Sequence, residues 1–164
     1  YDFGDGEMYQ VAANTGFALG ESGFINITAE WRDKDATNRS APDRRQQYPL
    51  INGAPDPREA SVNRLNHRFG DADTRDGSLF FNAALPLVEG WEFYSFGSYS
   101  ARDGNSAGFF RRALDARNIP AIYPDGFLPQ INSDVQDVAG VLGFRGDTES
   151  GWSYDISFNV GQSK

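Results

Sequence analysis

The sequence WSYDISFNVG, residues 152–161, decides the fold class because its large apolar and small polar side chains alternate strictly. An extended strand sends successive side chains to opposite faces, so one face of this segment is apolar and the other is polar. The apolar face carries Trp152, Tyr154, Ile156, Phe158 and Val160, and the polar face carries Ser153, Asp155, Ser157, Asn159 and Gly161. Such period-two alternation predicts a β-strand.

Five earlier segments repeat the alternation. In FINITAEWR, residues 24–32, the apolar face is formed by Ile25, Ile27, Ala29 and Trp31, opposite Asn26, Thr28 and Glu30. We expect six strands, over residues 8–19, 23–33, 77–87, 91–103, 134–146 and 151–162. They exceed the ~5–6 residues of an average strand, and they match the ~9–11 residues with which a tilted strand crosses a bilayer.

The connections between these segments alternate in length. Short polar turns at residues 20–23, 88–90 and 146–151 join strands in pairs, and long segments of about 34–76 and 104–133 separate the pairs. Irregular connections beyond ~12–15 residues are uncommon in compact domains. The pattern predicts an all-β, antiparallel up-and-down meander with short turns on one rim and long loops on the other, as in outer-membrane barrels. A β-sandwich has no reason to sort its loops in this way.

Composition further limits the classes of protein to which the chain can belong. The chain has 164 residues, a net charge of -8 and a mean hydropathy of -0.56. No apolar run approaches ~18 residues, which excludes a transmembrane helix but leaves open a barrel whose strands are apolar on one face. The absence of cysteine excludes disulfides and thiolate metal sites. The chain opens on YDFGDG without a signal segment and stops just after an alternating run, so we expect it to be a piece of a longer protein.

Six stretches, in this order along the chain, resemble part of the barrel of a TonB-dependent outer-membrane receptor. They are GFINITAEWRDKDATNRS, DPREASVNRLNHRFGDA, DGSLFFNAALPL, YSFGSYSARDGNSAGFFRRALDARN, YPDGFLPQI and GWSYDISFNVGQ. The resemblance covers nearly the whole chain and both long loops. It implies that residues 1–164 are a partial barrel domain, a three-hairpin slice of a 22-stranded transmembrane β-barrel, with the family's plug domain absent from this segment.

The resemblance also implies a function. Members of the family are receptors and transporters in the bacterial outer membrane that take up a scarce ligand, such as a siderophore, an oligosaccharide or a vitamin, by energy-coupled transport. The implied partners are a small-molecule ligand, outer-membrane lipid, the protein's own plug domain and, through it, the TonB energy-coupling protein. No nucleic acid and no cofactor are expected.

The long loops are expected to be partly helical. Residues 56–70 predict a short helix with Asp56 as N-cap, Pro57 at the first position and Glu59 closing a capping box. Residues 108–118 are expected to form another turn or two. The apolar side chains of NIPAIYPDGFLPQI, residues 118–131, are expected to pack against Val62, Leu65 and Phe69 as an apolar cap.

Five loop residues are candidates for ligand binding. The guanidinium groups of Arg44 and Arg45, together with Tyr48, could hold a carboxylate or a sugar. Two further candidates, Tyr123 and Phe127, offer aromatic rings. The alternative for the arginines is a loop braced by ion pairs, and for the rings it is packing within the loops. The Arg75-Asp76-Gly77 and Arg102-Asp103-Gly104 stretches are expected to face each other as a structural clamp at the rim.

The sequence gives no sign of an enzyme or a metal site. No catalytic constellation is present, which disfavours a β-rich hydrolase domain, and His67 is the single histidine. The aspartates of GDADTRDG, residues 70–77, do not have the spacing of a calcium loop. The main competing interpretation is a soluble β-sandwich that binds carbohydrate, which predicts shorter strands.

Overall fold

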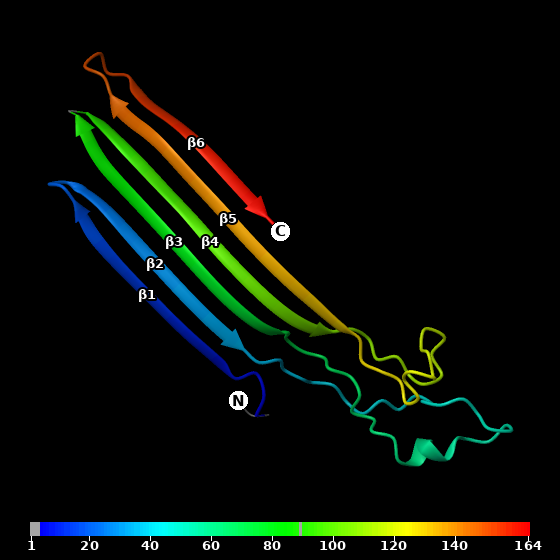
Figure 1. The fold of residues 1–164 in the computed structure, drawn as a ribbon. Helices are drawn as coiled ribbons and strands as arrows, with labels where there is room; N and C mark the ends of the chain where they lie inside the picture. The colour runs from blue at the N-terminus through cyan, green and yellow to red at the C-terminus, as the bar shows by residue number, and fades with distance from the viewer. Residues whose placement is uncertain (1–3, 89) are drawn as a thin grey trace. The chain divides into compact units, whose positions relative to one another are not determined.

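The structure is a computed structural model that describes residues 4–88 and 90–164. Six strands form one antiparallel meander in which each strand pairs with its neighbours in sequence, as expected (Figure 1). The strands are β1 (Met8–Leu19), β2 (Gly23–Lys34), β3 (Asp73–Val88), β4 (Trp91–Ala107), β5 (Gln130–Asp147) and β6 (Ser153–Ser163). Among the described residues no helix has the length and hydropathy to span a membrane.

The chain divides into two compact units. The sheet unit comprises Met8–Asp33, Thr74–Asp103 and Ser133–Lys164. The loop unit comprises Lys34–Asp73 and Gly104–Asn132 together with residues 4–7. The sheet unit therefore contains the alternating segments, and the loop unit contains the long connections.

Three strands continue farther toward the long loops than alternation predicts. β3 begins at Asp73 rather than at residue 77, β4 ends at Ala107 rather than at residue 103, and β5 begins at Gln130 rather than at residue 134. Strands pair through their backbone N–H and C=O groups, so polar segments can extend a strand. Such ends have no alternating apolar face and are not recognised from the sequence.

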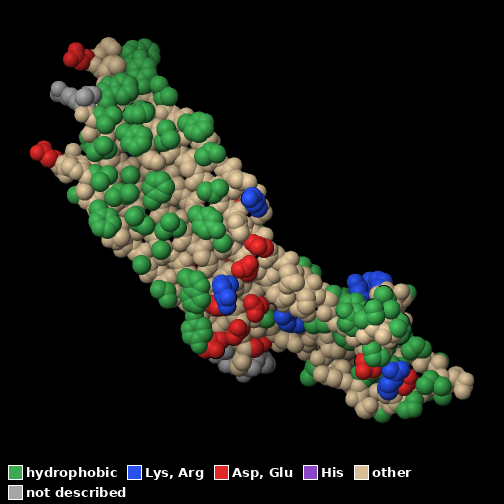
Figure 2. Space-filling model, viewed as in Figure 1, with side chains coloured by type: hydrophobic (Ala, Val, Ile, Leu, Met, Phe, Trp, Pro, Cys, Tyr) green, Lys and Arg blue, Asp and Glu red, His purple; other side chains and the backbone are tan. Residues whose placement is uncertain are grey.

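The two faces of the sheet differ in polarity. On one face, Asn14 Nδ2 donates to Asn26 Oδ1 at 2.7 Å, and the Tyr94 hydroxyl donates to Asp155 Oδ1 at 2.6 Å. On the other face, the rings of Phe93 and Phe144 lie 5.2 Å apart. This second face is covered with hydrophobic side chains, and Figure 2 shows it over the strands.

The hydrophobic face is exposed. In β6, Ile156, Phe158 and Val160 expose 69, 64 and 62% of their surface. They stand beside Phe144, Leu142 and Gly140 of β5 in the antiparallel register. β1 and β6 form the two edges of the sheet, and neither edge has a further partner strand among the described residues. The sheet is therefore open at both sides and bare on its apolar face.

The helix predicted over residues 56–70 is confirmed at its start, with Asp56 as N-cap and Pro57 at the first position, but it ends at Ala60. The described residues contain one four-residue 3-10 helix, Pro57–Ala60, whose N-cap Asp56 accepts from the backbone N–H of Arg58. The chain beyond it runs beside residues 37–43 instead, and the N–H groups of Arg39 and Asp43 donate to the carbonyls of Phe69 and Arg64. These tertiary hydrogen bonds replace the helical ones. Residues 108–118 form two turns, at residues 113–114 and 116–117, and neither of them is helical.

Close packing on the polar face gives a first prediction. A Cβ added at Gly143 of β5 would lie 2.5 Å from Cζ of Tyr94, whereas one added at Gly140 meets its nearest neighbour at 4.0 Å. We expect Gly143→Ala to displace Tyr94 from Asp155 and lower the free energy of unfolding by about 1–3 kcal/mol, measured by urea titration. Gly140→Ala on the same strand is the control, and Gly143→Ala in a Tyr94→Ala background is expected to be nearly neutral. Equal stability of the Gly143→Ala and Gly140→Ala variants would contradict the close packing of Tyr94 on Gly143.

Candidate functional site: a cleft in the loop unit

The loop unit is built on three Asp-x-Arg turns. In each turn an aspartate carboxylate accepts from the backbone N–H and from the guanidinium of the arginine two residues later. The pairs are Asp43–Arg45, Asp56–Arg58 and Asp115–Arg117, with Nη2–Oδ2 distances of 2.6, 2.8 and 2.9 Å. Asp43 and Asp56 are buried. Because the arginine closes the turn that its own aspartate caps, each motif fixes three residues, and that of Asp56 also caps the 3-10 helix Pro57–Ala60.

These turns lower the pKa of their aspartates. Hydrogen bonds from Arg45, Arg58 and Arg117 respectively are the largest cause of the shift for Asp43, Asp56 and Asp115. A depressed carboxyl pKa contributes stability that is present above the ordinary value of ~3.9 and is lost as the pH falls through the lowered value. The turns therefore stay ionised at neutral and mildly acidic pH.

Glu59 fixes the most buried segment of the loop unit. Its Oε1 accepts from the backbone N–H groups of Gln47 and Tyr48 at 2.6 and 2.8 Å, and its Oε2 accepts from Arg64 at 2.7 Å. Burial raises the pKa of Glu59, but these donors together outweigh it and the pKa is lowered. Gln47 and Tyr48 are only 1 and 2% exposed.

The same segment joins the two long loops. The N–H of Leu114 donates to the carbonyl of Gln47 at 3.1 Å, and Arg112 Nη1 donates to the carbonyl of Gln46 at 2.6 Å. The Tyr48 hydroxyl donates to Asp125 Oδ1 at 2.9 Å. The two loops are therefore held together by hydrogen bonds around one aromatic side chain, that of Tyr48.

Arg58 covers the ring of Tyr48. Its guanidinium carbon lies 4.0 Å from the ring centroid, and the same group pairs with Asp56 at 2.8 Å and with Asp125 at 3.3 Å. A cation over an aromatic face is an additional attraction. The Arg58 side chain is thus held by two carboxylates and a ring.

A cleft of about 460 Å³ opens beside this cluster, between the two long loops. Small-molecule sites span roughly 300–1,000 Å³, so the volume suits a small ligand. Its lining consists of Tyr48, Arg58, Ser61, Val62, Asn63, Asn66, Phe110, Asp125 and Gly126.

Three polar groups of the lining have no fixed partner. Among the described residues, nothing hydrogen-bonds to Asp125 Oδ2 or to Asn63 Nδ2, and the Ser61 hydroxyl has only a long 3.5 Å contact with the carbonyl of Arg58. The Asp125 side chain is 64% exposed. The cleft therefore presents a carboxylate oxygen, an amide N–H₂ and a hydroxyl to a ligand.

The five residues proposed from sequence do not gather at one place. Tyr48 lines the cleft. Arg45 is held by Asp43, and its guanidinium lies 4.9 Å from the Phe109 ring. Arg44 is exposed and forms no hydrogen bond or ion pair with any residue in the described ranges. Tyr123 and Phe127 stack on each other with centroids 4.5 Å apart, and Tyr123 is 44% exposed.

The cleft residues beyond Tyr48 had no strong sequence signal. Asp125 and Gly126 belong to a Pro-Asp-Gly turn, which predicts a turn and no ligand contact. Ser61 and Asn63 lie in the stretch expected to be helical. The signal that was overlooked is the Asp-x-Arg spacing of Asp56 and Arg58.

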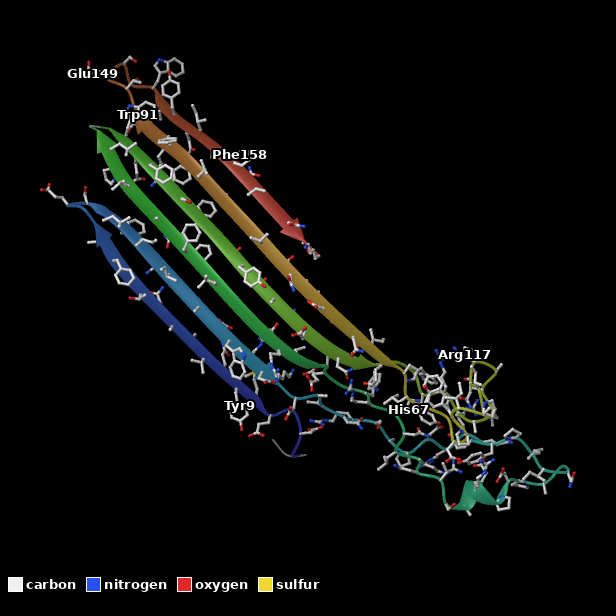
Figure 3. All side chains as sticks on the ribbon, in the orientation of Figure 1. Tyr9, His67, Trp91, Arg117, Glu149 and Phe158 are labelled. Carbon is white, nitrogen blue, oxygen red and sulfur yellow. The ribbon has the colours of Figure 1, made fainter. Side chains whose placement is uncertain are left out.

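The predicted apolar cap is wrong. Ile119, Ile122 and Ile131 are 58, 62 and 56% exposed, and their expected partners Leu65 and Phe69 are 58 and 76% exposed. The loop core is occupied instead by charged turns and buried amides. His67 lies in this unit (Figure 3), with its ring 4.9 Å from the ring of Phe109.

The charged stretches at the loop end of the sheet form the expected clamp. Asp76 of β3 accepts from Arg32 of β2 at 2.8 Å and pairs with Arg102 of β4. Arg75 pairs with Asp33 at 3.0 Å. These ion pairs tie three neighbouring strands together. No cluster of three acidic or histidine side chains that could hold a metal ion occurs in the described part of the chain.

A larger hollow of about 990 Å³ lies in the sheet unit near the short turns. Of its charged groups, Arg145 Nε donates to Glu92 at 2.7 Å, Asp155 accepts from Tyr94, and Asp147 accepts from the hydroxyl of Ser153. Tyr48, one of the five residues predicted from sequence, lines the cleft of the loop unit, whereas none of the five lines this hollow, so the cleft is the candidate site.

Comparison of the chain with family models, curated proteins and solved structures finds no match.

Glu59 gives the second prediction. Glu59→Ala leaves the buried N–H groups of Gln47 and Tyr48 without an acceptor, at about 1–3 kcal/mol for each group. We expect faster hydrogen exchange at these two amides and at Leu114, measured by NMR. Glu149→Ala in an exposed turn is the control. Unchanged exchange at Gln47 and Tyr48 would contradict the role of Glu59.

Proposed function

We propose that this chain is a segment of the barrel of a TonB-dependent outer-membrane receptor, a transporter for energy-coupled uptake of a scarce ligand. The observation that carries the proposal is the bare hydrophobic face of the six-stranded sheet. Strands of 11 to 18 residues carry this face along their alternating parts, and a bilayer is crossed by tilted strands of ~9–11 residues.

Lipid is the partner that suits the apolar face. Exposed apolar surface costs roughly 25 cal/mol per Å² in water, and soluble proteins seldom leave a patch above a few hundred Å² uncovered. Acyl chains remove that cost. The polar face then becomes the wall of the lumen, which includes Asn26, Thr28, Glu30, Asn82, Asp155, Ser157 and Asn159.

The open edges support a slice of a larger barrel. A transmembrane strand needs a partner on both sides because lipid satisfies no backbone N–H or C=O. About eight strands are the smallest closed barrel, so β1 and β6 would pair with further strands of the receptor, 22 in all. The resemblance in sequence makes this family the proposed one.

The ends of the strands fit the orientation of such a receptor. Both long connections leave from the same end of the sheet, and short turns join the strands at the other. In outer-membrane barrels long loops are extracellular and short turns periplasmic. The loop unit would then capture the ligand outside the cell, and the plug domain and TonB would drive its passage. No catalytic role is proposed.

The three tryptophans provide the third prediction. By strand alternation Trp31 lies on the hydrophobic face, Trp91 stacks on Tyr154 at 6.5 Å, and Trp152 is 67% exposed. Trp91 lies at the short-turn end of the sheet (Figure 3) and Trp31 near the opposite end of β2. We expect lipids brominated near the headgroup to quench their fluorescence more than lipids brominated near the chain end, because the rings would form interfacial girdles.

Adjacent lysine substitutions are the matched control. At the middle of β6, Phe158→Lys places a charge on the lipid face, at about 2–4 kcal/mol, whereas Asn159→Lys places it on the lumen face. Insertion into vesicles is expected to fail or weaken in the first variant only. A soluble β-sandwich predicts a stable folded monomer without lipid and no bromine quenching, and that result would refute the proposal.

A further inference from the structure

We propose that the cleft of the loop unit binds a neutral, polyhydroxylated ligand, such as one or two sugar units of an oligosaccharide. The inference rests on the proposed function, because it assigns a ligand class to the loops of that receptor. It is carried by the charge, the free hydrogen-bonding groups and the size of the cleft.

The charge of the cleft disfavours an anion. Arg58 is its one guanidinium, and that group already pairs with Asp56 at 2.8 Å and with Asp125 at 3.3 Å. The single positive charge of Arg58 is thus paired with two negative charges, those of Asp56 and Asp125. An anionic ligand would meet the free oxygen of Asp125 with no unpaired cation in the lining to offset the repulsion.

The free groups match hydroxyls. Asp125 Oδ2 only accepts, Asn63 Nδ2 only donates, and the Ser61 hydroxyl does both. A hydroxyl also donates and accepts, so the hydroxyls of a sugar can partner groups of all three kinds. A divalent cation takes about six to eight oxygens, and one free carboxylate falls short of that.

The cleft is preformed where the ligand would bind. Asp125 is held by the Tyr48 hydroxyl at 2.9 Å through Oδ1, which leaves Oδ2 directed to other partners. Gly126 has φ of 85°, and a side chain there would collide with the carbonyl of Arg111. Asn63 Oδ1 accepts from the N–H of Leu65 at 2.9 Å, which orients its amide. Fixed groups of this kind lower the entropic cost of binding.

The test is binding to the full receptor that contains this chain, folded in detergent micelles and measured by isothermal titration, because the six strands alone leave two edges unpaired. The neutral probes are maltotriose, cellotriose and xylotriose, with trigalacturonic acid as the anionic counterpart and spermidine as the cationic one. We expect at least one neutral trisaccharide to bind, and the charged probes to bind more weakly than it does.

Two isosteric variants locate the site. Asn63→Asp keeps the acceptor for Leu65 and removes the amide donor, and Asp125→Asn keeps the acceptor for Tyr48 and removes the free carboxylate oxygen. Each is expected to weaken binding about tenfold, in line with one lost hydrogen bond. Asn52→Asp makes the same exchange at an exposed loop position with φ of 51° outside the cleft lining, and it is expected to leave binding unchanged.

The outcomes separate the two proposals. Failure of every neutral probe, tighter binding of trigalacturonic acid or spermidine, or equal affinity of the wild type and both cleft variants would overturn the polyol site. If bromine quenching of the tryptophans persists in the same sample, the barrel proposal stands while the polyol site falls. If quenching is also absent, the barrel proposal falls with it.

Discussion

The molecule depends on one constraint, the need to cover a sheet that is apolar on one face and polar on the other. Backbone hydrogen bonds hold the six strands side by side, but they do nothing for Ile156, Phe158 and Val160, which stand more than 60% exposed. The free energy of leaving such a face in water exceeds what a small domain's net stability tolerates. Strand length, the alternation of side chains and the sorting of loops are all accounted for if lipid covers that face.

In the loop unit, long irregular segments are held in place without a large apolar core. Among its described residues, the buried hydrophobic ones are Tyr48, Phe110 and Ala113. Buried backbone groups need partners, and Glu59 and the three Asp-x-Arg turns supply them. Charged hydrogen bonds are stronger than neutral ones, so a few carboxylates replace a hydrophobic core. The polar groups left over around Asp125 form the candidate binding surface.

Local patterns predicted the sheet well because alternation is a property of each strand alone. The meander follows from WSYDISFNVG and its five counterparts, and the clamp follows from charged stretches that end neighbouring strands. The loops were predicted poorly because their structure is set by contacts distant in sequence. Glu59 had the spacing of a capping box, yet its carboxylate binds the N–H groups of Gln47 and Tyr48, and the helix ends at Ala60. No local pattern shows that competition.

The central claim is that one face of the sheet meets lipid and the other meets water. The chain has no cysteine, so single cysteines at residues 153–161 of the full receptor, with any cysteine outside this chain replaced, can each carry one nitroxide in lipid vesicles. The account predicts period-two accessibility, with even-numbered positions open to dissolved oxygen and odd-numbered positions open to a water-soluble nickel complex. Equal access at neighbouring positions, or even-numbered positions shielded from oxygen in a protein that stays folded without lipid, would contradict it.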